Sequence, residues 1–441
     1  MQGILSLKET PPLNAPLRFF LTAPLFPIAA GGLLLWSGPD LLTSRWTPSA
    51  LALTHLITAG FMLQVMLGAL LQLLPVVVGA HISHPQRIAT IVHATLTSGT
   101  VCLVAGFLSM QPLWFGSAVV LLGTSVLTFA VSAGRALLGV PAITPIAWGL
   151  RLALLGLLVT VGLGLLLGVS LGWSWNVPLA HWANIHMGWG LVGWGTALLG
   201  AVGLVVVPMF QQTPQYPGWF ERGFVGATVT AVAAWSLAEW LAWEPAATVL
   251  SLVIVSGVVV FAVTTLRLQH RSKRASMSAV QRLWQVAMVS TLIACALWLL
   301  VRAQPVLDQW QGWPLLFGAL LLLGGFMSVM VGMLYKIVPF LVWMHLQERG
   351  KGRLLTPNMK KVLPEVQVER QTRAHFLAFG LILLAVWQPV WFTYPAGVAL
   401  VVANGWLLRN LLLAMTVYRQ HLAKIEALSG SEPQPLRHPP H

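Results

Sequence analysis

Apolar stretches long enough to cross a lipid bilayer run almost from one end of this sequence to the other. A spanning helix needs about 20 mainly apolar residues, and here such stretches are interrupted only by short joints rich in proline, glycine or charged residues. Of the 441 residues, 57% are hydrophobic and 8% are charged, which is too few charged residues to cover a water-soluble protein of this size. We therefore predict an all-α integral membrane protein whose main partner is the lipid bilayer. No nucleic-acid partner is expected, although the net charge is +14.

The joints between the apolar stretches predict about twelve transmembrane helices. The expected ranges are 16–37, 49–79, 88–109, 113–133, 148–171, 180–209, 220–242, 246–267, 282–302, 314–345, 374–393 and 396–418. The first stretch is longer than the core of a signal peptide, so we expect it to stay in the protein as a helix.

The distribution of basic residues predicts the orientation of these helices. When the joints are assigned alternately to the two sides, nearly all Lys and Arg residues fall on the side of both termini, and only Arg45 and Arg302 fall in joints on the other side. Because basic joints face the cytoplasm, we expect both termini in the cytoplasm and the chain in a bacterial-type inner (cytoplasmic) membrane.

Three of the predicted helices end alike, on prolines at nearly constant spacing. Pro75, Pro208 and Pro339 are separated by 133 and 131 residues. Small residues precede each proline at fixed distances: Gly68, Ala201 and Gly332 by seven residues, and Gly60, Gly193 and Gly324 by fifteen. We predict one membrane domain of three four-helix repeats, at about 14–135, 146–270 and 280–420, followed by a polar C-terminal tail at 421–441. Packing alone is the alternative explanation, since Gly and Pro are common in membrane helices.

This layout, with equivalent second, sixth and tenth helices, resembles subunit I of the haem-copper oxidase superfamily. The segment Gly332–Pro339 is similar to the end of the tenth helix in the C-type oxidases and nitric oxide reductases, and His186–Pro208 is similar to their sixth helix. The resemblance implies that His55, 20 residues before Pro75, occupies the place of a haem ligand. It also implies that His186, 22 residues before Pro208, lies close to the place of a copper ligand.

The sequence departs from this family where the oxygen-reducing centre is expected. The paired histidines of the tenth helix correspond to the segment 317–319, which is Phe-Gly-Ala, and no histidine occurs between His270 and His345. The predicted seventh helix has no histidine pair, and neither it nor the sixth helix contains a tyrosine. We therefore expect a divergent member, similar to the NnrS family, without the standard dinuclear centre.

Histidines near the outer helix ends are the candidate ligands for haem iron or copper, because neutral imidazole is buried at low cost and binds either metal without adding charge. The candidates are His55, His181 and His186, together with Glu239. Five residues turn a helix by about 140° net, so His181 and His186 cannot both face one metal unless the helix begins between them. We favour His186, with His181 in the preceding loop. Hydrogen bonding or headgroup contact is the alternative role for each.

Two further candidates lie toward the predicted cytoplasmic side. His93, close in sequence to the loop histidines His81 and His84, could assist inward delivery of a metal, but a hydrocarbon layer of about 30 Å separates it from His55. Arg409, which is near Asn404 and Asn410 in sequence, is a candidate for binding a haem propionate or another anion. Snorkelling of Arg409 to the lipid headgroups is the alternative.

These observations lead to three hypotheses of function. The first is a protein that binds haem, expected to be of b type, and/or copper, and that serves electron transfer or the response to nitric oxide or respiratory stress. Its partner would be a cytochrome or a respiratory complex, and any enzymatic activity would be that of an oxidoreductase. The second is a transporter or channel for a small solute, metal or haem. The third is a scaffold subunit of a respiratory complex. The sequence contains no nucleotide-binding loop, haem c attachment motif or hydrolase triad.

Overall fold

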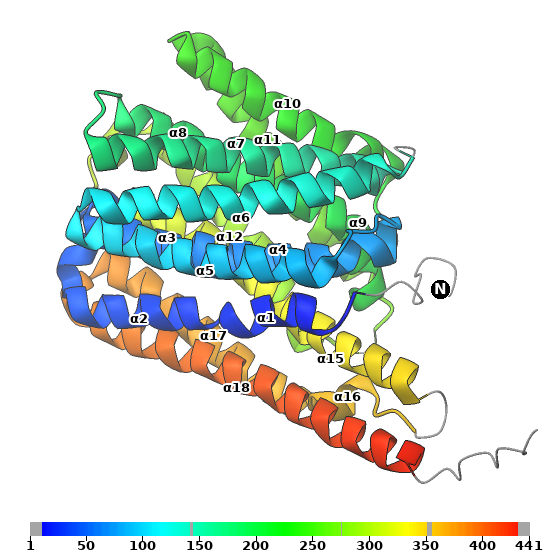
Figure 1. Cartoon of the computed structure of the whole chain (residues 1–441). Helices are drawn as coiled ribbons and strands as arrows, with labels where there is room; N and C mark the ends of the chain where they lie inside the picture. Colours follow the sequence, from blue (N-terminus) through cyan, green and yellow to red (C-terminus); the bar gives the residue numbers. More distant parts are fainter. Residues whose placement is uncertain (1–10, 142–143, 275, 351–354, 431–441) are drawn as a thin grey trace, which may run out of the picture.

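A computed structural model describes residues 11–141, 144–274, 276–350 and 355–430, and these residues form helices without any β-strand. The helices run roughly side by side in one bundle, and α1 begins at the same end of the bundle at which α18 ends (Figure 1). The elements are α1 (Asn14–Thr22), α2 (Leu25–Ser37), η2 (Gly38–Thr43), α3 (Pro48–His55), η3 (Leu56–Leu63), α4 (Gln64–Leu73), η4 (Leu74–Val78), α5 (Pro85–Ser109), α6 (Pro112–Leu138), α7 (Pro145–Trp173), α8 (Leu179–Gly188), η5 (Trp189–Thr196), α9 (Ala197–Gln211), α10 (Gly218–Trp240), α11 (Glu244–His270), α12 (Ala279–Ala303), α13 (Pro305–Asp308), α14 (Trp313–Ala319), η6 (Leu320–Met327), α15 (Ser328–Gly350), α16 (Met359–Val362), α17 (Glu365–Trp387) and α18 (Pro389–Gly430).

Helices occupy all twelve positions predicted from the sequence. By length and composition, 10 of the helices in the described part of the chain can cross a membrane. The two long helices outside that set are α10 and α17, which do not reach the required mean hydropathy and charge limits. The protein is therefore an all-α, multi-pass membrane protein, as predicted. Of the twelve crossings predicted, ten are helices that qualify by length and apolar character within the described residues.

The last two helices differ from the predicted boundaries. The turn between them lies at Gln388, so that Pro395, expected in a joint, lies inside α18. The basic segment expected to be a loop up to residue 373 is helical from Glu365 onward, and there Glu369 forms an ion pair with Arg282 of α12. Helix α18 continues to Gly430, so the first part of the predicted tail is helical, while 431–441 lies outside the described residues.

The three proline-bearing helices share an unusual feature at one position. Each contains an eight-residue π-helical segment, and these are η3, η5 and η6. Each segment ends twelve residues before its proline, at Leu63, Thr196 and Met327. A π-helical stretch widens the turn and is found often at functional sites. The common register was visible in the sequence only as the spacing of small residues.

The small residues of the π segments bring neighbouring helices into close contact. An added Cβ at Gly60 would collide with Phe26 of α2, and one at Gly324 would collide with Ser290 of α12. On α7, an added Cβ at Gly156 would collide with the backbone carbonyl of Gly193 in η5. Thus each π segment packs directly against the preceding predicted helix, which is α2, α7 or α12. Helix α18 in turn packs against α2 and brings the end of the chain back to its beginning.

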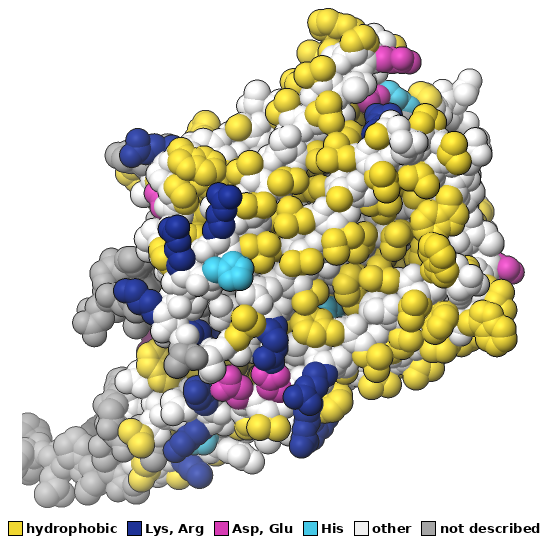
Figure 2. Space-filling view, turned by 180° about the vertical axis from the view of Figure 1, so that it is seen from behind, with side chains coloured by type: hydrophobic (Ala, Val, Ile, Leu, Met, Phe, Trp, Pro, Cys, Tyr) yellow, Lys and Arg dark blue, Asp and Glu magenta, His cyan; other side chains and the backbone are white. Residues whose placement is uncertain are grey.

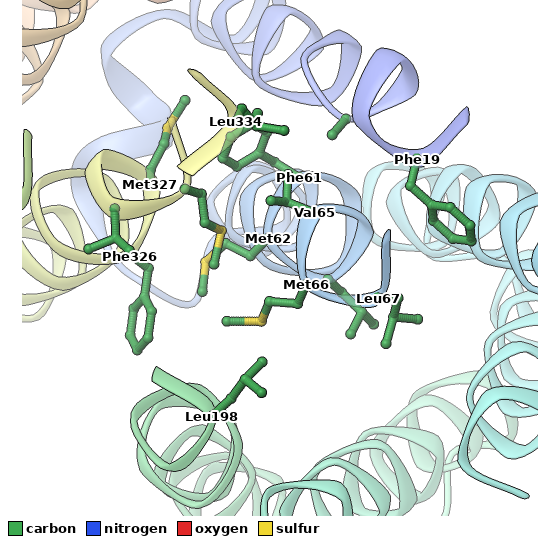
Figure 3. Close-up of a cluster of buried hydrophobic side chains, with 14 of the residues drawn as sticks. Phe19, Phe61, Met62, Val65, Met66, Leu67, Leu198, Phe326, Met327 and Leu334 are labelled. Carbon is green, nitrogen blue, oxygen red and sulfur yellow. The ribbon is translucent and has the colours of Figure 1, made fainter. Parts of the chain in front are cut away.

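The three proline-bearing helices also meet in the interior of the bundle. Figure 3 shows Met62 and Met66, from η3 and α4, close to Leu198 of α9 and to Phe326 and Met327 of η6. All five side chains are buried. This apolar centre holds together the helices on which the candidate ligands stand.

Basic and apolar side chains occupy different parts of the surface. On the face shown in Figure 2 hydrophobic side chains cover the body of the bundle, and most of the visible Lys and Arg side chains gather toward the end where α18 finishes. That end is called the basic end below. Exposed tryptophans mark the other end, among them Trp36, Trp46, Trp173, Trp175, Trp240 and Trp243, which is the distribution expected of residues at a membrane interface.

Candidate cofactor site

A large cavity lies at the end of the bundle opposite the basic end, where α3, α8 and α14 begin. Its volume is about 1080 Å³, at the upper limit of about 300–1,000 Å³ that is typical of ligand pockets. Most of the lining is apolar. The polar and ionisable side chains on its wall are Arg45, Thr54, His55, Thr58, Thr160, Asn184, His186, Glu239, Ser251, Arg302 and Asp308. Both histidines favoured by the sequence thus face the same cavity.

His55 is held at the end of α3 by the local structure. Thr47 caps this helix by accepting a hydrogen bond from the backbone N–H of Ala50, and Pro48 begins its first turn. The Nδ1 of His55 donates to the carbonyl of Leu51 at 2.8 Å. The ring also packs against Phe107 of α5, with ring centres 5.0 Å apart. These contacts fix the ring, and its Nε2 has no hydrogen bond to any residue that the structure describes.

His186 is held on α8 in a corresponding way by its neighbour α7. Its Nδ1 donates to the carbonyl of Thr160 at 2.9 Å. The ring lies over Gly164, where an added Cβ would come within 3.0 Å of the His186 Cε1 atom. A glycine at position 164 therefore gives the imidazole its place against α7.

The two imidazoles lie next to each other across the cavity wall. Their ring centres are 6.4 Å apart and their planes differ by 18°. Because backbone carbonyls can only accept, both Nδ1 atoms carry the proton, and both Nε2 atoms keep a lone pair that can bind a metal. Two imidazoles that bind one ion from opposite sides have ring centres about 6 Å apart, since each metal–nitrogen bond is about 2 Å long and the nitrogen lies about 1 Å from its ring centre. The observed distance between the ring centres, 6.4 Å, is close to this value.

His181 and Glu239 form a separate pair at the rim of the site. Helix α8 begins at Leu179, so the expectation that His181 lies in a loop before the helix is wrong. Its Nδ1 lies 3.9 Å from a carboxylate oxygen of Glu239, and each side chain is about one-third exposed, at 33% and 32%. Both His181 and His186 stand on one helix, and the net turn between them directs His181 away from His55.

The remaining two candidates lie away from this site. His93 of α5 shares a hydrogen bond of 2.8 Å with Thr22 of α1 and packs edge-on against Phe19. Arg409 is exposed on α18, whereas its sequence neighbours Asn404 and Asn410 are buried. Neither His93 nor Arg409 lines the cavity, so the structure does not bring either of them to His55 and His186.

Two cations at the cavity were assigned only to outer joints by the sequence. Arg45 donates to the side-chain oxygen of Asn184 at 3.0 Å and stacks on Trp46, and Arg302 lies over the ring of Trp298 at 5.3 Å. Burial lowers the pKa of the Arg45 guanidinium, and the nearby Asp308 carboxylate opposes that shift. The sequence could have identified Arg45 and Arg302 as candidates, because they are the two basic residues in joints on the side opposite the basic end.

The donor set decides which cofactors fit. Among the described residues, no group of three or more His, Cys, Asp and Glu side chains could hold a metal ion. A three-histidine copper centre or a closed zinc site therefore does not fit, because zinc takes four ligands in structural sites and three protein ligands in catalytic ones. Two neighbouring imidazoles, with ring centres 6.4 Å apart, are a donor pair that would suit a haem iron or a single copper ion.

Comparison with protein-family models found no match to this sequence, and no curated protein matches it. The choice of cofactor therefore rests on the geometry of the cavity.

Proposed function

We propose that this membrane protein binds a haem in the cavity, and that His55 and His186 are the residues that would hold its iron. The observation that carries the proposal is a pair of imidazoles on the wall of a cavity of about 1080 Å³, with ring centres 6.4 Å apart and each Nδ1 bonded to a backbone carbonyl. A bis-histidine haem supplies one-electron transfer, which suits a role in respiratory electron transfer or in the response to nitric oxide.

The wall of the cavity supports a haem in preference to a lone copper ion. A copper ion with two ligands would leave most of the apolar volume unused, whereas a porphyrin needs apolar walls around its ring. The carboxylates of a haem also need cations, and Arg45 and Arg302 lie on the cavity wall. These arginines replace Arg409 as the residues proposed to hold the propionates.

We also propose kinship with subunit I of the haem-copper oxidases, as a divergent and NnrS-like member built of three four-helix repeats. The common register of η3, η5 and η6 supports the repeats. Packing of α6 on α7, α11 on α12 and α18 on α2 also supports them, because each pair joins the last helix of one repeat to the first helix of another. The resemblance implies different cofactors for His55 and His186. The proposal differs, because here the two imidazoles lie side by side, with ring centres 6.4 Å apart.

The orientation proposed from the sequence places the basic end in the cytoplasm and the cavity on the opposite side of the membrane. The gathering of Lys and Arg side chains in Figure 2 supports this orientation. Arg45 and Arg302, the exceptions in the sequence, both face the cavity. Electrons would then reach the haem from a partner outside the cytoplasm or from within the bilayer.

The test is an absorption spectrum with iron and copper analysis of the full-length protein, purified in detergent from a host that makes haem b. The wild type should show a Soret band and close to one iron per chain. His55→Ala and His186→Ala should each lose the band, since one imidazole cannot replace the other. His181→Ala and His93→Ala are the matched controls and should keep it.

The outcomes separate the candidate functions. If the protein contains copper and no haem, and the copper is lost in His55→Ala and His186→Ala, then the two histidines are the ligands and copper is the cofactor. A colourless, metal-free wild type would sink the proposal and favour a transporter or a scaffold subunit, and transport assays on the cavity would then be the next step.

A further inference from the structure

Two half-buried cations lie close together at the basic end of the bundle. Arg274 stands in the joint between α11 and α12, and Lys336 stands on α15, three residues before Pro339. Lys336 is near enough to Arg274 for the two charges to interact. Partly buried charges are screened by salt much less than exposed ones. The repulsion between these two cations is therefore unfavourable unless an anion lies beside them.

Arg274 is held in place by the end of helix α9. The hydroxyl of Ser272 donates to the carbonyl of Gln211 at 2.7 Å, which fixes the joint against α9. One terminal nitrogen of the Arg274 guanidinium donates to the carbonyl of Phe210 at 3.2 Å. Its Nε is buried and has no acceptor in the described part of the protein. The guanidinium is thus positioned by neutral carbonyls, which do not neutralise its charge.

Lys336 is placed beside this joint by the packing of α15 on α12. Gly332 stands one turn before Lys336, and an added Cβ there would lie 3.5 Å from the side chain of Val280, in the first turn of α12. The joint that carries Arg274 leads directly into that turn. Lys336 forms no hydrogen bond or ion pair with any residue that the structure describes. Its ammonium group therefore keeps three N–H donors for a ligand.

The carboxylates nearby on α17 are engaged with other cations. Glu365 is near enough to Lys336 for their charges to interact, but it is exposed and lies 3.8 Å from the ammonium of Lys360. Glu369, one turn further along α17, forms an ion pair with Arg282 of α12. Among the described residues, no carboxylate lies within ion-pair distance of either half-buried cation. The protein thus leaves two adjacent positive charges without a counter-charge of its own.

The chemistry of the two side chains indicates which anion fits between them. A guanidinium presents several N–H donors in a fixed fork, and an ammonium group adds a compact charge with three more donors. A phosphate group offers several acceptor oxygens and forms strong charge-assisted hydrogen bonds with both. Basic pockets between membrane helices are known to bind the phosphates of lipid headgroups. At this end of the bundle, a phosphate could come from a lipid headgroup or from solution.

We propose that Arg274 and Lys336 form a binding site for a phosphate group at the basic end of the bundle. The phosphate oxygens accept hydrogen bonds from the guanidinium and from the ammonium group, and the negative charge removes the repulsion between the two cations. Binding ties the joint between α11 and α12 to α15. The site lies at the opposite end of the bundle from the cavity, so the proposal does not depend on a bound haem.

The first test measures the thermal midpoint of the full-length wild-type protein in a neutral detergent, after lipid removal has been checked by phosphorus analysis. Inorganic phosphate is compared with potassium chloride at equal ionic strength, and phosphatidylglycerol with phosphatidylcholine of the same chain length. A ligand of the folded protein should raise the midpoint saturably, by at least about 2 °C beyond its reference. A rise with phosphatidylglycerol alone assigns the site to a lipid headgroup, and a rise with inorganic phosphate assigns it to a soluble phosphate. No rise with either would overturn the proposal.

The second test compares variants in the same titration. Arg274→Gln and Lys336→Gln should each weaken binding of the stabilising phosphate at least about tenfold, because each removes a charged hydrogen-bond donor. The matched control is Lys273→Gln, which removes the same charge from an exposed side chain next to Arg274 and should bind within about twofold of the wild type. Without phosphate, Lys336→Gln should be at least as stable as the wild type, because the repulsion is gone. Equal weakening in Lys273→Gln would mean a general attraction of anions to the basic end and would overturn the site.

Discussion

Helix α8 carries two histidines, His181 and His186, whose side chains lie in different chemical environments. His186 faces the cavity, its Nδ1 is held by the carbonyl of Thr160, and the ring lies parallel to that of His55. His181, on the same helix, lies at a rim with its side chain one-third exposed and forms a loose pair with Glu239 at 3.9 Å. The residue type is identical, so the difference arises from the neighbouring helices.

The comparison shows what makes a histidine a plausible ligand in this protein. A ligand histidine needs its second nitrogen engaged, so that the ring is oriented and the free nitrogen is the one that points at the metal. His55 and His186 meet this condition. His181 lies 3.9 Å from the carboxylate of Glu239, and both side chains are partly exposed to solvent. An exposed ion pair of this kind contributes about 0–1 kcal/mol to the free energy of unfolding.

The largest effect on this contrast should come from Gly156→Ala on α7. The added Cβ would collide with the carbonyl of Gly193 in η5, so α7 must move away from the helix that carries His186. Thr160 stands one turn further along α7, and its carbonyl would move with it. We expect a loss of about 2 kcal/mol or more in the free energy of unfolding, measured by denaturant titration in detergent, together with loss of the Soret band.

The control for this prediction is Gly162→Ala on the same helix, where nothing lies within 4 Å of an added Cβ. It should be neutral or slightly stabilising, because alanine favours the helix over glycine. Equal losses in Gly156→Ala and Gly162→Ala would mean that close packing of α7 on η5 does not support the site.

A more local effect is expected from Gly164→Val, which crowds His186 alone. The first atom of the new side chain would lie about 3.0 Å from the His186 Cε1 atom, and the branched methyl groups would push the ring from its place. Haem titration should give about tenfold weaker binding, equivalent to about 1.4 kcal/mol. Gly162→Val is the matched variant, and a comparable loss of affinity in that protein would contradict the assigned role of Gly164.

A smaller effect is expected from the cations at the cavity. Arg45→Gln should weaken haem binding about threefold to tenfold, since a partly hydrated charge pair contributes about 1 kcal/mol. Arg302→Gln should act in the same direction. The comparison variant is Arg409→Gln on the exposed face of α18, which should bind haem like the wild type. A larger loss of haem affinity in Arg409→Gln than in Arg45→Gln would mean that Arg409, and not Arg45, binds the propionates.

The smallest effect should come from the second histidine pair. His181→Ala and Glu239→Gln should each change the free energy of unfolding by less than about 1 kcal/mol, because the pair is loose and partly exposed. The Soret band should stay in position in both proteins. A shift of the band in His181→Ala would show that the two histidines of α8 are not as independent as their separation suggests.

Much of the fold could be predicted from the sequence because a membrane admits few solutions. Every backbone polar group must be satisfied within the bilayer, so long apolar stretches such as those ending at Pro75, Pro208 and Pro339 have to become helices. The turn between α17 and α18 was placed wrongly, since Pro389 and Pro395 are equally able to break a helix by sequence alone, and only packing decides between them.

The residues of the candidate site could be predicted in part. Spacing to the prolines singled out His55 and His186, which line the cavity. Arg45, Arg302 and Asn184 were not singled out, since their approach to the cavity depends on how separate helices meet. His93 and Arg409 were candidates because helix ends and depth are visible in a sequence. The neighbouring helices that each side chain contacts cannot be seen in a sequence.

The sequence by itself determined that this chain crosses a membrane many times, that its proline-bearing helices are alike and that two histidines stand near their outer ends. These properties follow from composition and periodicity along one chain, which the bilayer converts directly into helices. Only the tertiary structure decided that His55 and His186 lie next to each other on the cavity wall while His181 does not line the cavity. That choice depends on the close contact of Gly156 with Gly193 and on the carbonyl of Thr160, which are contacts between helices far apart in sequence.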